Sequence, residues 1–162
     1  MSTVTVAEHA GFCFGVKRAV DGAYKALENA GGKPVYCLGS LIHNKAVTDE
    51  LAEKGLITVS DVAEVPDGGV MLIRAHGEPD SSYDAAKAKN IEILDFTCPF
   101  VAKIHSLAKK SEADGRSFLV IGDIDHPEVK GIIGWSEGKV TVSSFLPKAA
   151  MGPFMSLQRQ ES

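Results

Sequence analysis

The chain has 162 residues and a formal net charge of −4, with 44% hydrophobic and 23% charged residues. This composition is typical of a soluble globular protein of one domain or two small ones. The acidic balance argues against nucleic-acid binding, and no apolar run approaches the roughly 20 residues of a membrane span. The amino-terminal residues lack the basic and apolar regions of a signal peptide. Three widely spaced cysteines do not suggest a disulfide framework, so a cytoplasmic location is expected.

Strand-like and helix-like segments alternate along the chain. Short apolar runs typical of strands occur at 4–7, 34–38, 56–59, 70–73, 91–94, 118–121 and 139–142. Helical spacing of apolar residues lies between most of them, at about 16–30, 45–54, 80–90, 99–114 and 131–135. Ser40 or Asn44 is suited to cap the second of these helices. The alternation predicts an α/β fold of repeated βαβ units with parallel sheets, in which 70–73, 91–94 and 118–121 are the best-buried segments.

The stretch from Asp95 to His105 places a cysteine where a strand ends and a helix begins. Cys98 is followed by Pro99, which is favoured in the first helical turn because it has no N–H group to leave unpaired. The amides and dipole of a helix start favour a thiolate, the form of cysteine that binds metals and attacks electrophiles. A buried structural cysteine is the alternative for this residue taken alone.

Cysteines and histidines recur at the same place in the predicted units. Each of five such residues comes just after an expected strand: Cys13, His43, His76, Cys98 and His126. In open parallel α/β sheets, ligands bind outside the carboxyl ends of the strands. A single histidine is usually an ordinary structural or surface residue, but five coincident placements predict one shared site at this edge.

The residue types at these positions allow more than one chemistry. Cysteines and histidines can ligate zinc, but no Cys-x-x-Cys or His-Glu-x-x-His spacing is present, and thiolates on separate loops also suit an iron–sulfur cluster. Protonated histidines and helix starts suit an anionic substrate. Glu128, two residues from His126, can deliver a proton to a leaving hydroxyl, or is simply an acid that favours a helix start.

Five motifs in order carry a resemblance to a known family. They are the segments 11–19, 42–44, 75–77, 95–99 and 126–129, and the likeness runs over about residues 4–143. Together they resemble 4-hydroxy-3-methylbut-2-enyl diphosphate reductase, the last enzyme of the non-mevalonate isoprenoid pathway. The resemblance implies a three-lobed α/β fold around a 4Fe–4S cluster, with one cysteine ligand from each lobe.

The resemblance also implies roles for individual residues. Cys13 and Cys98 match two cluster ligands, while His43, His76 and His126 match the histidines of the substrate pocket, with His43 and His76 near the diphosphate. Glu128, with His126, matches the group that protonates and expels the substrate hydroxyl. The implied reaction is reductive dehydroxylation of an allylic diphosphate to isopentenyl and dimethylallyl diphosphate, with electrons from ferredoxin or flavodoxin.

The sequence also departs from the family. Its members are about twice as long, so the third lobe, with its cysteine and diphosphate site, is not expected here. Cys37 does not replace that cysteine, because it lies inside a predicted strand. We expect a first lobe at 1–97, an incomplete second lobe at 98–143 and an atypical tail at 144–162, as an early stop, a frameshift or a fragmentary gene would produce.

Two functions of different kinds follow. The first is the reductase, or a truncated form of it that carries half of the active site. The second is a non-catalytic α/β fragment that binds a phosphorylated ligand or zinc. A thiol redox enzyme is a third reading, but no resolving cysteine lies near Cys13 or Cys98.

Overall fold

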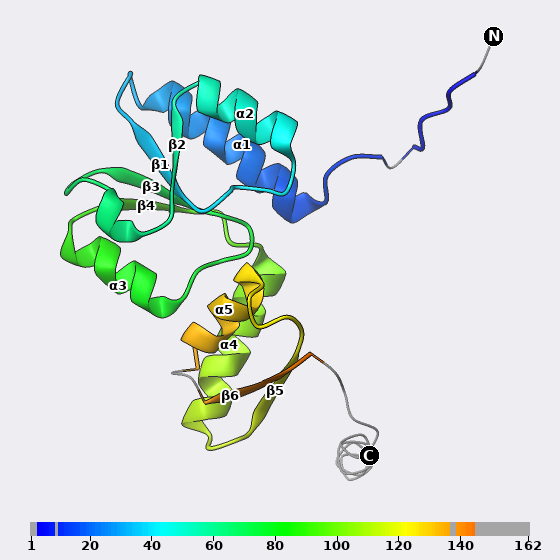
Figure 1. Ribbon diagram of the computed structural model, residues 1–162, viewed down its shortest axis with the longest axis vertical. Coiled ribbons are helices and arrows are strands. Elements are labelled where there is room, and N and C mark those ends of the chain that lie inside the picture. Colours follow the sequence, from blue (N-terminus) through cyan, green and yellow to red (C-terminus); the bar gives the residue numbers. More distant parts are fainter. Residues whose placement is uncertain (1–2, 9, 137–138, 145–162) are drawn as a thin grey trace.

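A computed structural model describes residues 3–8, 10–136 and 139–144 as an α/β protein with two parallel sheets (Figure 1). The elements of the first sheet region are α1 (Phe14–Asn29), β1 (Val35–Leu38), α2 (Lys45–Glu53), β2 (Leu56–Val59), the 3₁₀ turn η1 (Val62–Glu64), β3 (Val70–Ile73), α3 (Asp80–Ala88) and β4 (Glu92–Asp95). The elements that follow are α4 (Pro99–Ala113), β5 (Phe118–Ile121), α5 (Pro127–Gly134) and β6 (Val140–Ser143). The predicted α/β class with parallel strands is confirmed.

The first sheet has four parallel strands in the order β2-β1-β3-β4. Helices α1 and α2 lie on one side of it, whereas α3 and η1 lie on the other (Figure 1). Because successive side chains of a strand point to opposite faces, each central strand contributes to two cores. Cys37 and Leu72 pack with α1 and α2, while Met71 and Ile73 pack with α3 and η1. This two-sided burial explains why β1 and β3 are almost continuously apolar.

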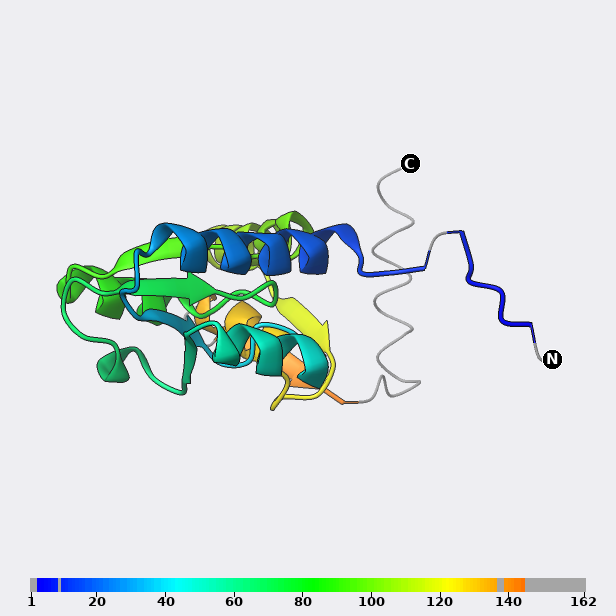
Figure 2. The same cartoon turned by 90° about the horizontal axis from the view of Figure 1, so that it is seen from above.

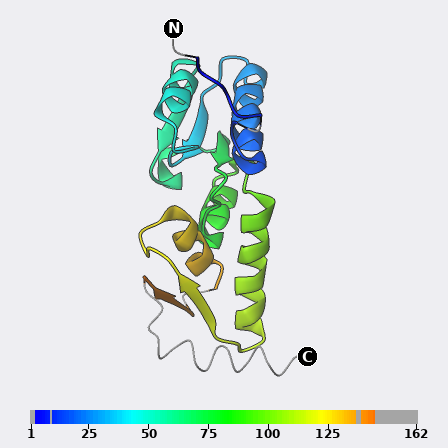
Figure 3. The same ribbon diagram turned by 90° about the vertical axis from the view of Figure 1, so that its right-hand side faces the viewer.

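The second sheet contains only β5 and β6, and α4 packs against both β5 and α5 (Figure 3). Alternate residues of β5 remain open to solvent, since Leu119 is 37% exposed and Ile121 is 51% exposed. The prediction that 118–121 is among the best-buried segments is therefore wrong. A two-stranded ribbon with helices on one side leaves its other face uncovered within the described residues.

The fourth strand of the first sheet is also less buried than expected. It runs from Glu92 to Asp95, one residue later than predicted, and both end residues are exposed. Ile93 and Leu94 are half-buried, because β4 lies at the edge of the sheet. Of the three segments expected to be best buried, only β3 has three fully buried residues.

The strand expected at 4–7 is not formed. Val4 and Val6 are 86% and 76% exposed, and the segment pairs with no strand in the described part of the chain. It leads away from the body of the molecule (Figure 2). Alternating β-branched residues favour a strand, but a strand needs a neighbour to pair with. Cys13 thus precedes α1 without following a strand, which corrects one of the five predicted placements.

The last helix begins earlier than expected, at Pro127 rather than Gly131, because His126 caps it. The division at 1–97 and 98–143 stays a prediction, and nearly all of the tail predicted at 144–162 falls outside the described residues. No helix in the described ranges is long and apolar enough to cross a membrane.

Shortening Leu72 to alanine should strongly destabilise the protein, because this β3 side chain is fully buried between α1 and α2. We expect Leu72→Ala to lower the free energy of unfolding by about 2–5 kcal/mol in urea titrations. Ile57→Ala is the matched control, since Ile57 on β2 is 42% exposed and its truncation should cost much less. Equal losses of unfolding free energy in the two variants would contradict the difference in burial between these two side chains.

Candidate functional site

The site begins at the point where the order of strands in the first sheet reverses. From β1 the chain crosses through α2 to β2 on one side, and from β3 it crosses through α3 to β4 on the other. The loops that follow neighbouring strands β1 and β3 therefore separate and leave a crevice between them, the usual ligand position in such sheets. His43 lies on the first loop and His76 on the second, with ring centroids 4.9 Å apart.

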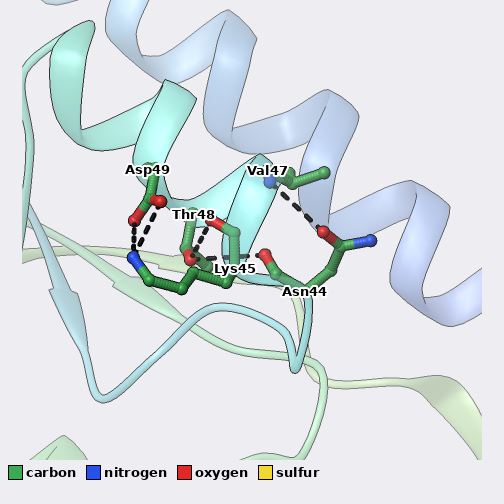
Figure 4. Close-up of polar contacts among 5 residues, drawn as sticks. All are labelled: Asn44, Lys45, Val47, Thr48 and Asp49. Atoms are coloured by element: carbon green, nitrogen blue, oxygen red, sulfur yellow. Dashed lines mark hydrogen bonds and ion pairs between the residues drawn. The ribbon is translucent and has the colours of Figure 1, made fainter.

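The loop after β1 is anchored from both ends. Leu41 and Ile42 are buried in the core, and Asn44 caps α2 by accepting a hydrogen bond from the backbone N–H of Val47 at 3.3 Å (Figure 4). Asn44 rather than Ser40 is thus the cap, because the Ser40 hydroxyl donates to the Ile42 carbonyl instead. His43 lies between these anchors and is exposed.

The loop after β3 is held by a buried ion pair. The Nε of Arg74 donates to the Glu78 carboxylate at 2.8 Å, and both side chains are at most 15% exposed. Gly77 has φ +72° and its N–H bonds to the Arg74 carbonyl at 3.0 Å, which closes a tight turn that favours glycine. The turn sets His76 at the crevice.

His126 reaches the same place from the second sheet. It follows β5 and caps α5, with Nδ1 accepting a hydrogen bond from the Glu128 backbone N–H at 3.2 Å. Its ring centroid is 5.8 Å from that of His76 and 6.4 Å from that of His43. Because Nδ1 accepts this bond, the proton of the neutral ring is on Nε2. The structure therefore brings together all three predicted histidines, from three loops and two sheets.

Each of the two predicted ligand cysteines lies at the start of a helix. Cys13 is the N-cap residue of α1 and Cys98 that of α4, and neither thiol makes a capping hydrogen bond. A Cβ at Gly15 would lie 2.9 Å from the Sγ of Cys98, so the Cys98 thiol rests against the first turn of α1. The start of α1 therefore lies against the thiol at the start of α4.

The segment that carries Cys98 is tied down on both sides. Its backbone N–H donates to the Ala75 carbonyl at 3.0 Å, which links it to the loop of His76. The guanidinium of Arg18 on α1 donates to the carbonyls of Asp95 and Thr97 at 3.0 and 2.8 Å. The Cys98 segment is therefore held against the loop of His76 by a main-chain hydrogen bond and against α1 by the Arg18 side chain.

Cys37 is the remaining cysteine of the chain, and it is buried inside β1 as the sequence indicated. Burial raises the pKa of its thiol to about 12. It therefore stays protonated at neutral pH and cannot act as a thiolate ligand.

A cavity of about 270 Å³ lies between the start of α1 and the two crevice loops. It is lined by Phe12, Val16, Ile42, His43, Asn44, Ala75 and His76. A lining of two imidazole rings together with apolar side chains suits a small ligand with an anionic head and an apolar body.

The electrostatics of His76 differ from the expectation of a charged imidazole. Burial, together with smaller effects of the nearby Arg74, His43 and His126, lowers the pKa of His76 to about 4. His76 is therefore neutral at pH 7 and offers an N–H donor rather than a full charge. A bound anion would oppose this shift, because it stabilises the protonated ring.

The described side chains fit an iron–sulfur cluster as part of its ligand set. Two thiols at helix starts are the ligand type that such clusters use. No group of three or more Cys, His, Asp or Glu side chains among the described residues is arranged to hold a metal ion by itself. A cluster held by Cys13 and Cys98 would therefore need a further ligand from outside the described residues.

Comparison with known proteins shows the family to which the chain belongs. A family model described as LytB protein matches residues 4–157. The chain belongs to the LytB family. It is 47% identical over 134 residues to 4-hydroxy-3-methylbut-2-enyl diphosphate reductase of Alkaliphilus oremlandii and 46% identical over 140 residues to that of Clostridioides difficile. These matches cover 83% and 86% of the chain but 48% and 50% of the relatives, so it spans about half the length of the curated relatives it matches.

Solved structures of LytB reductases have the same fold. The reductase from Plasmodium falciparum superposes with a TM-score of 0.80 at 29% identity, covering 84% of this chain and 42% of that one. A second structure, described as the terminal enzyme of the non-mevalonate pathway, superposes with a TM-score of 0.74 at 35% identity. The match covers 94% of this chain and 54% of that one. The predicted family is thereby confirmed.

Several residues that build the crevice were not assigned a role from sequence. Arg18 holds the Cys98 segment, the Arg74–Glu78 pair holds the His76 loop, and buried His105 lies behind that loop. A side chain at Gly15 would clash with Cys98, which lies over eighty residues away in the chain. No local pattern identifies such contacts.

Acidification should destabilise the protein through His76. The unfolded chain has an ordinary histidine pKa near 6.5, whereas the folded value is about 4, so between these pH values the unfolded state binds more protons. The free energy of unfolding should therefore fall as the pH drops from 6.5 to 4. His76→Gln should reduce this slope without abolishing it, because burial also lowers the pKa of His105. Equal slopes in urea titrations of both proteins would refute the assignment.

Proposed function

We propose that this chain provides part of the active site of a 4-hydroxy-3-methylbut-2-enyl diphosphate reductase. The observation that carries the proposal is the convergence of His43, His76 and His126 beside the helix starts at Cys13 and Cys98. The family relationship supports it. The substrate is then an allylic diphosphate, and the products are isopentenyl and dimethylallyl diphosphate.

The cavity between the two crevice loops is the proposed substrate pocket. His43 and His76 receive the diphosphate through their ring N–H groups, and the amides at the start of α2 add further donors. Phe12, Val16 and Ile42 face the hydrocarbon part of the substrate and keep water away.

The proton for the leaving hydroxyl is assigned to the start of α5. His126 is held with its N–H on Nε2, and Glu128 lies in the first turn of the same helix. We assign Glu128 as the general acid and His126 as the group that orients the hydroxyl towards it.

Cys13 and Cys98 are the proposed ligands of a 4Fe–4S cluster. Such a cluster supplies the two electrons that the reductive removal of a hydroxyl group requires. Ferredoxin or flavodoxin is the proposed electron donor, and a cytoplasmic location follows from this partner.

The alternative of a zinc-binding fragment receives less support. Zinc sites use three or four protein ligands, and the described residues present no cluster of that size. A non-catalytic protein that binds a phosphorylated ligand would use the same histidines. Measurements of iron and sulfide content and of turnover distinguish it from the reductase.

Loss of either proposed ligand cysteine should abolish cluster binding. After anaerobic reconstitution with iron and sulfide, we expect the chain to bind iron substoichiometrically, because it offers two thiolates. Cys13→Ser and Cys98→Ser should lose this iron and the acid-labile sulfide. Cys37→Ala is the control and should retain both, since its buried thiol does not ligate. Retention of wild-type iron by either serine variant would remove that residue from the ligand set.

The 162-residue chain by itself should not turn over substrate. A cluster with an incomplete protein shell is open to water and oxygen, and exposed apolar side chains such as Phe14 and Phe100 favour association. The assay is reduced viologen oxidation with the allylic diphosphate under anaerobic conditions. Sustained turnover would show that the chain, or a second copy of it, completes the site.

Glu128→Gln should slow catalysis without affecting the cluster. In an enzyme that joins this chain to the remaining half of a relative, we expect turnover to fall by about 10²–10⁴-fold, because an amide cannot donate the proton. Cluster absorbance and iron content should equal those of the unsubstituted enzyme. Glu92→Gln, on the exposed edge strand, is the matched control and should leave turnover unchanged.

A further inference from the structure

One contact between the second sheet region and the first sheet lies at the end of α5. Trp135 is the C-cap residue of this helix, and its indole Nε1–H donates to the main-chain carbonyl of Glu78 at 2.9 Å. Glu78 follows His76 by two residues in the loop after β3. The same helix begins at His126, its N-cap residue. One short helix therefore runs from the loop of His76 to the place where His126 enters the site.

The indole ring of Trp135 is also held by side chains of two other helices. The ring of His105 on α4 stacks on it with centroids 5.6 Å apart and planes at 19°. Tyr83 on α3 meets it at 63° with centroids 5.8 Å apart, and the ammonium of Lys109 lies 5.1 Å from the ring centroid. Stacked and edge-to-face rings attract each other beyond the effect of the area they bury. Trp135 therefore holds the end of α5 against both α3 and α4.

Two glycines of α5 let the helix lie close to these neighbours. A Cβ at Gly134 would lie 2.9 Å from the Cα of Pro79, closer than real Cβ atoms come to another heavy atom. A Cβ at Gly131 would lie 3.0 Å from Nε2 of His105. The backbone of α5 thus rests directly on the residue after Glu78 and on α4, which leaves the helix little room to shift towards either.

We propose that Trp135 is a positioning residue that sets the distance between the ring of His126 and the ring of His76. The carbonyl that it binds lies two residues from His76, and the helix that it ends is capped by His126. Because α5 has only 8 residues, a shift of its last turn also moves its first turn. Fixing the end of α5 therefore fixes the 5.8 Å separation of the two ring centroids.

The consequence for catalysis rests on the proposed function. Glu128 lies in the first turn of α5, so the contact that places His126 also places this acid relative to the histidines of the first sheet. A misplacement of about 1 Å in a catalytic group can lower a rate about 10²-fold. The positions of the rings themselves do not depend on that function.

The test is the nuclear Overhauser effect between histidine ring protons in the full 162-residue chain, because it reports which rings are close together. In the wild-type protein we expect cross-peaks of His76 with both His43 and His126, whose ring centroids lie 4.9 and 5.8 Å away. Trp135→Leu removes the indole N–H and the aromatic contacts. It should lose the His76–His126 cross-peaks and keep the His43–His76 cross-peaks, since His43 and His76 both lie on loops of the first sheet.

Tyr24→Leu is the matched control. Tyr24 is another half-buried aromatic residue with a lysine beside its ring, but it packs in the core between α1 and α2. This variant should keep both sets of cross-peaks. Unchanged His76–His126 cross-peaks in Trp135→Leu would overturn the proposal. Loss of both sets in a folded Trp135→Leu would also overturn it, because the residue would then support the whole site rather than the position of α5.

Gly134→Ala is a second, independent perturbation, and it decides should Trp135→Leu fail to fold. Its methyl group would press on Pro79, so α5 has to move away from the loop while the Trp135 side chain is unaltered. We expect the same selective loss of the His76–His126 cross-peaks, and their retention would overturn the proposal. These measurements need no cluster, substrate or turnover, so their failure is distinguishable from a failure of the proposed function.

Discussion

The parallel pairing of β1 with β3 is the interaction on which the rest of the site depends. These strands are adjacent in the sheet although α2, β2 and η1 lie between them in the chain. Their carboxyl ends therefore release two loops in opposite directions, and the crevice between the loops holds His43 and His76. The pairing is stabilised from both sides, because each strand buries alternate side chains in two separate cores.

The contact between α1 and the segment after β4 joins the thiols to this crevice. Gly15 lets the Cys98 thiol lie against α1, while Arg18 binds the carbonyls of Asp95 and Thr97. Cys98 in turn donates to Ala75 in the His76 loop. Cys98 and His76, which are distant in the chain, are thus held together by one main-chain hydrogen bond, and the Arg18 side chain ties the same segment to α1.

Burial gives the chemically similar residues of this protein different properties. Cys37 in the core is kept protonated, whereas Cys13 is exposed and Cys98 is partly exposed, each at the start of a helix. His76 is kept neutral by burial and by three neighbouring cations or imidazoles. A neutral ring in the proposed diphosphate pocket supplies a directed hydrogen-bond donor, and its protonation becomes coupled to the arrival of an anion.

Sequence alone was sufficient for the α/β class, the family and most element boundaries, because periodicity, glycine stops and short motifs are local. It also placed His43, His76, Cys98 and His126 at loops that follow strands. It failed for 4–7 and 118–121, whose apolar residues favour strands and burial without showing whether a partner strand or covering helix exists. Only the tertiary structure decided that the three histidine rings meet, that Arg18 and His105 support the site, and that His76 is neutral. These properties arise from contacts between residues distant in the chain, and no local pattern encodes them.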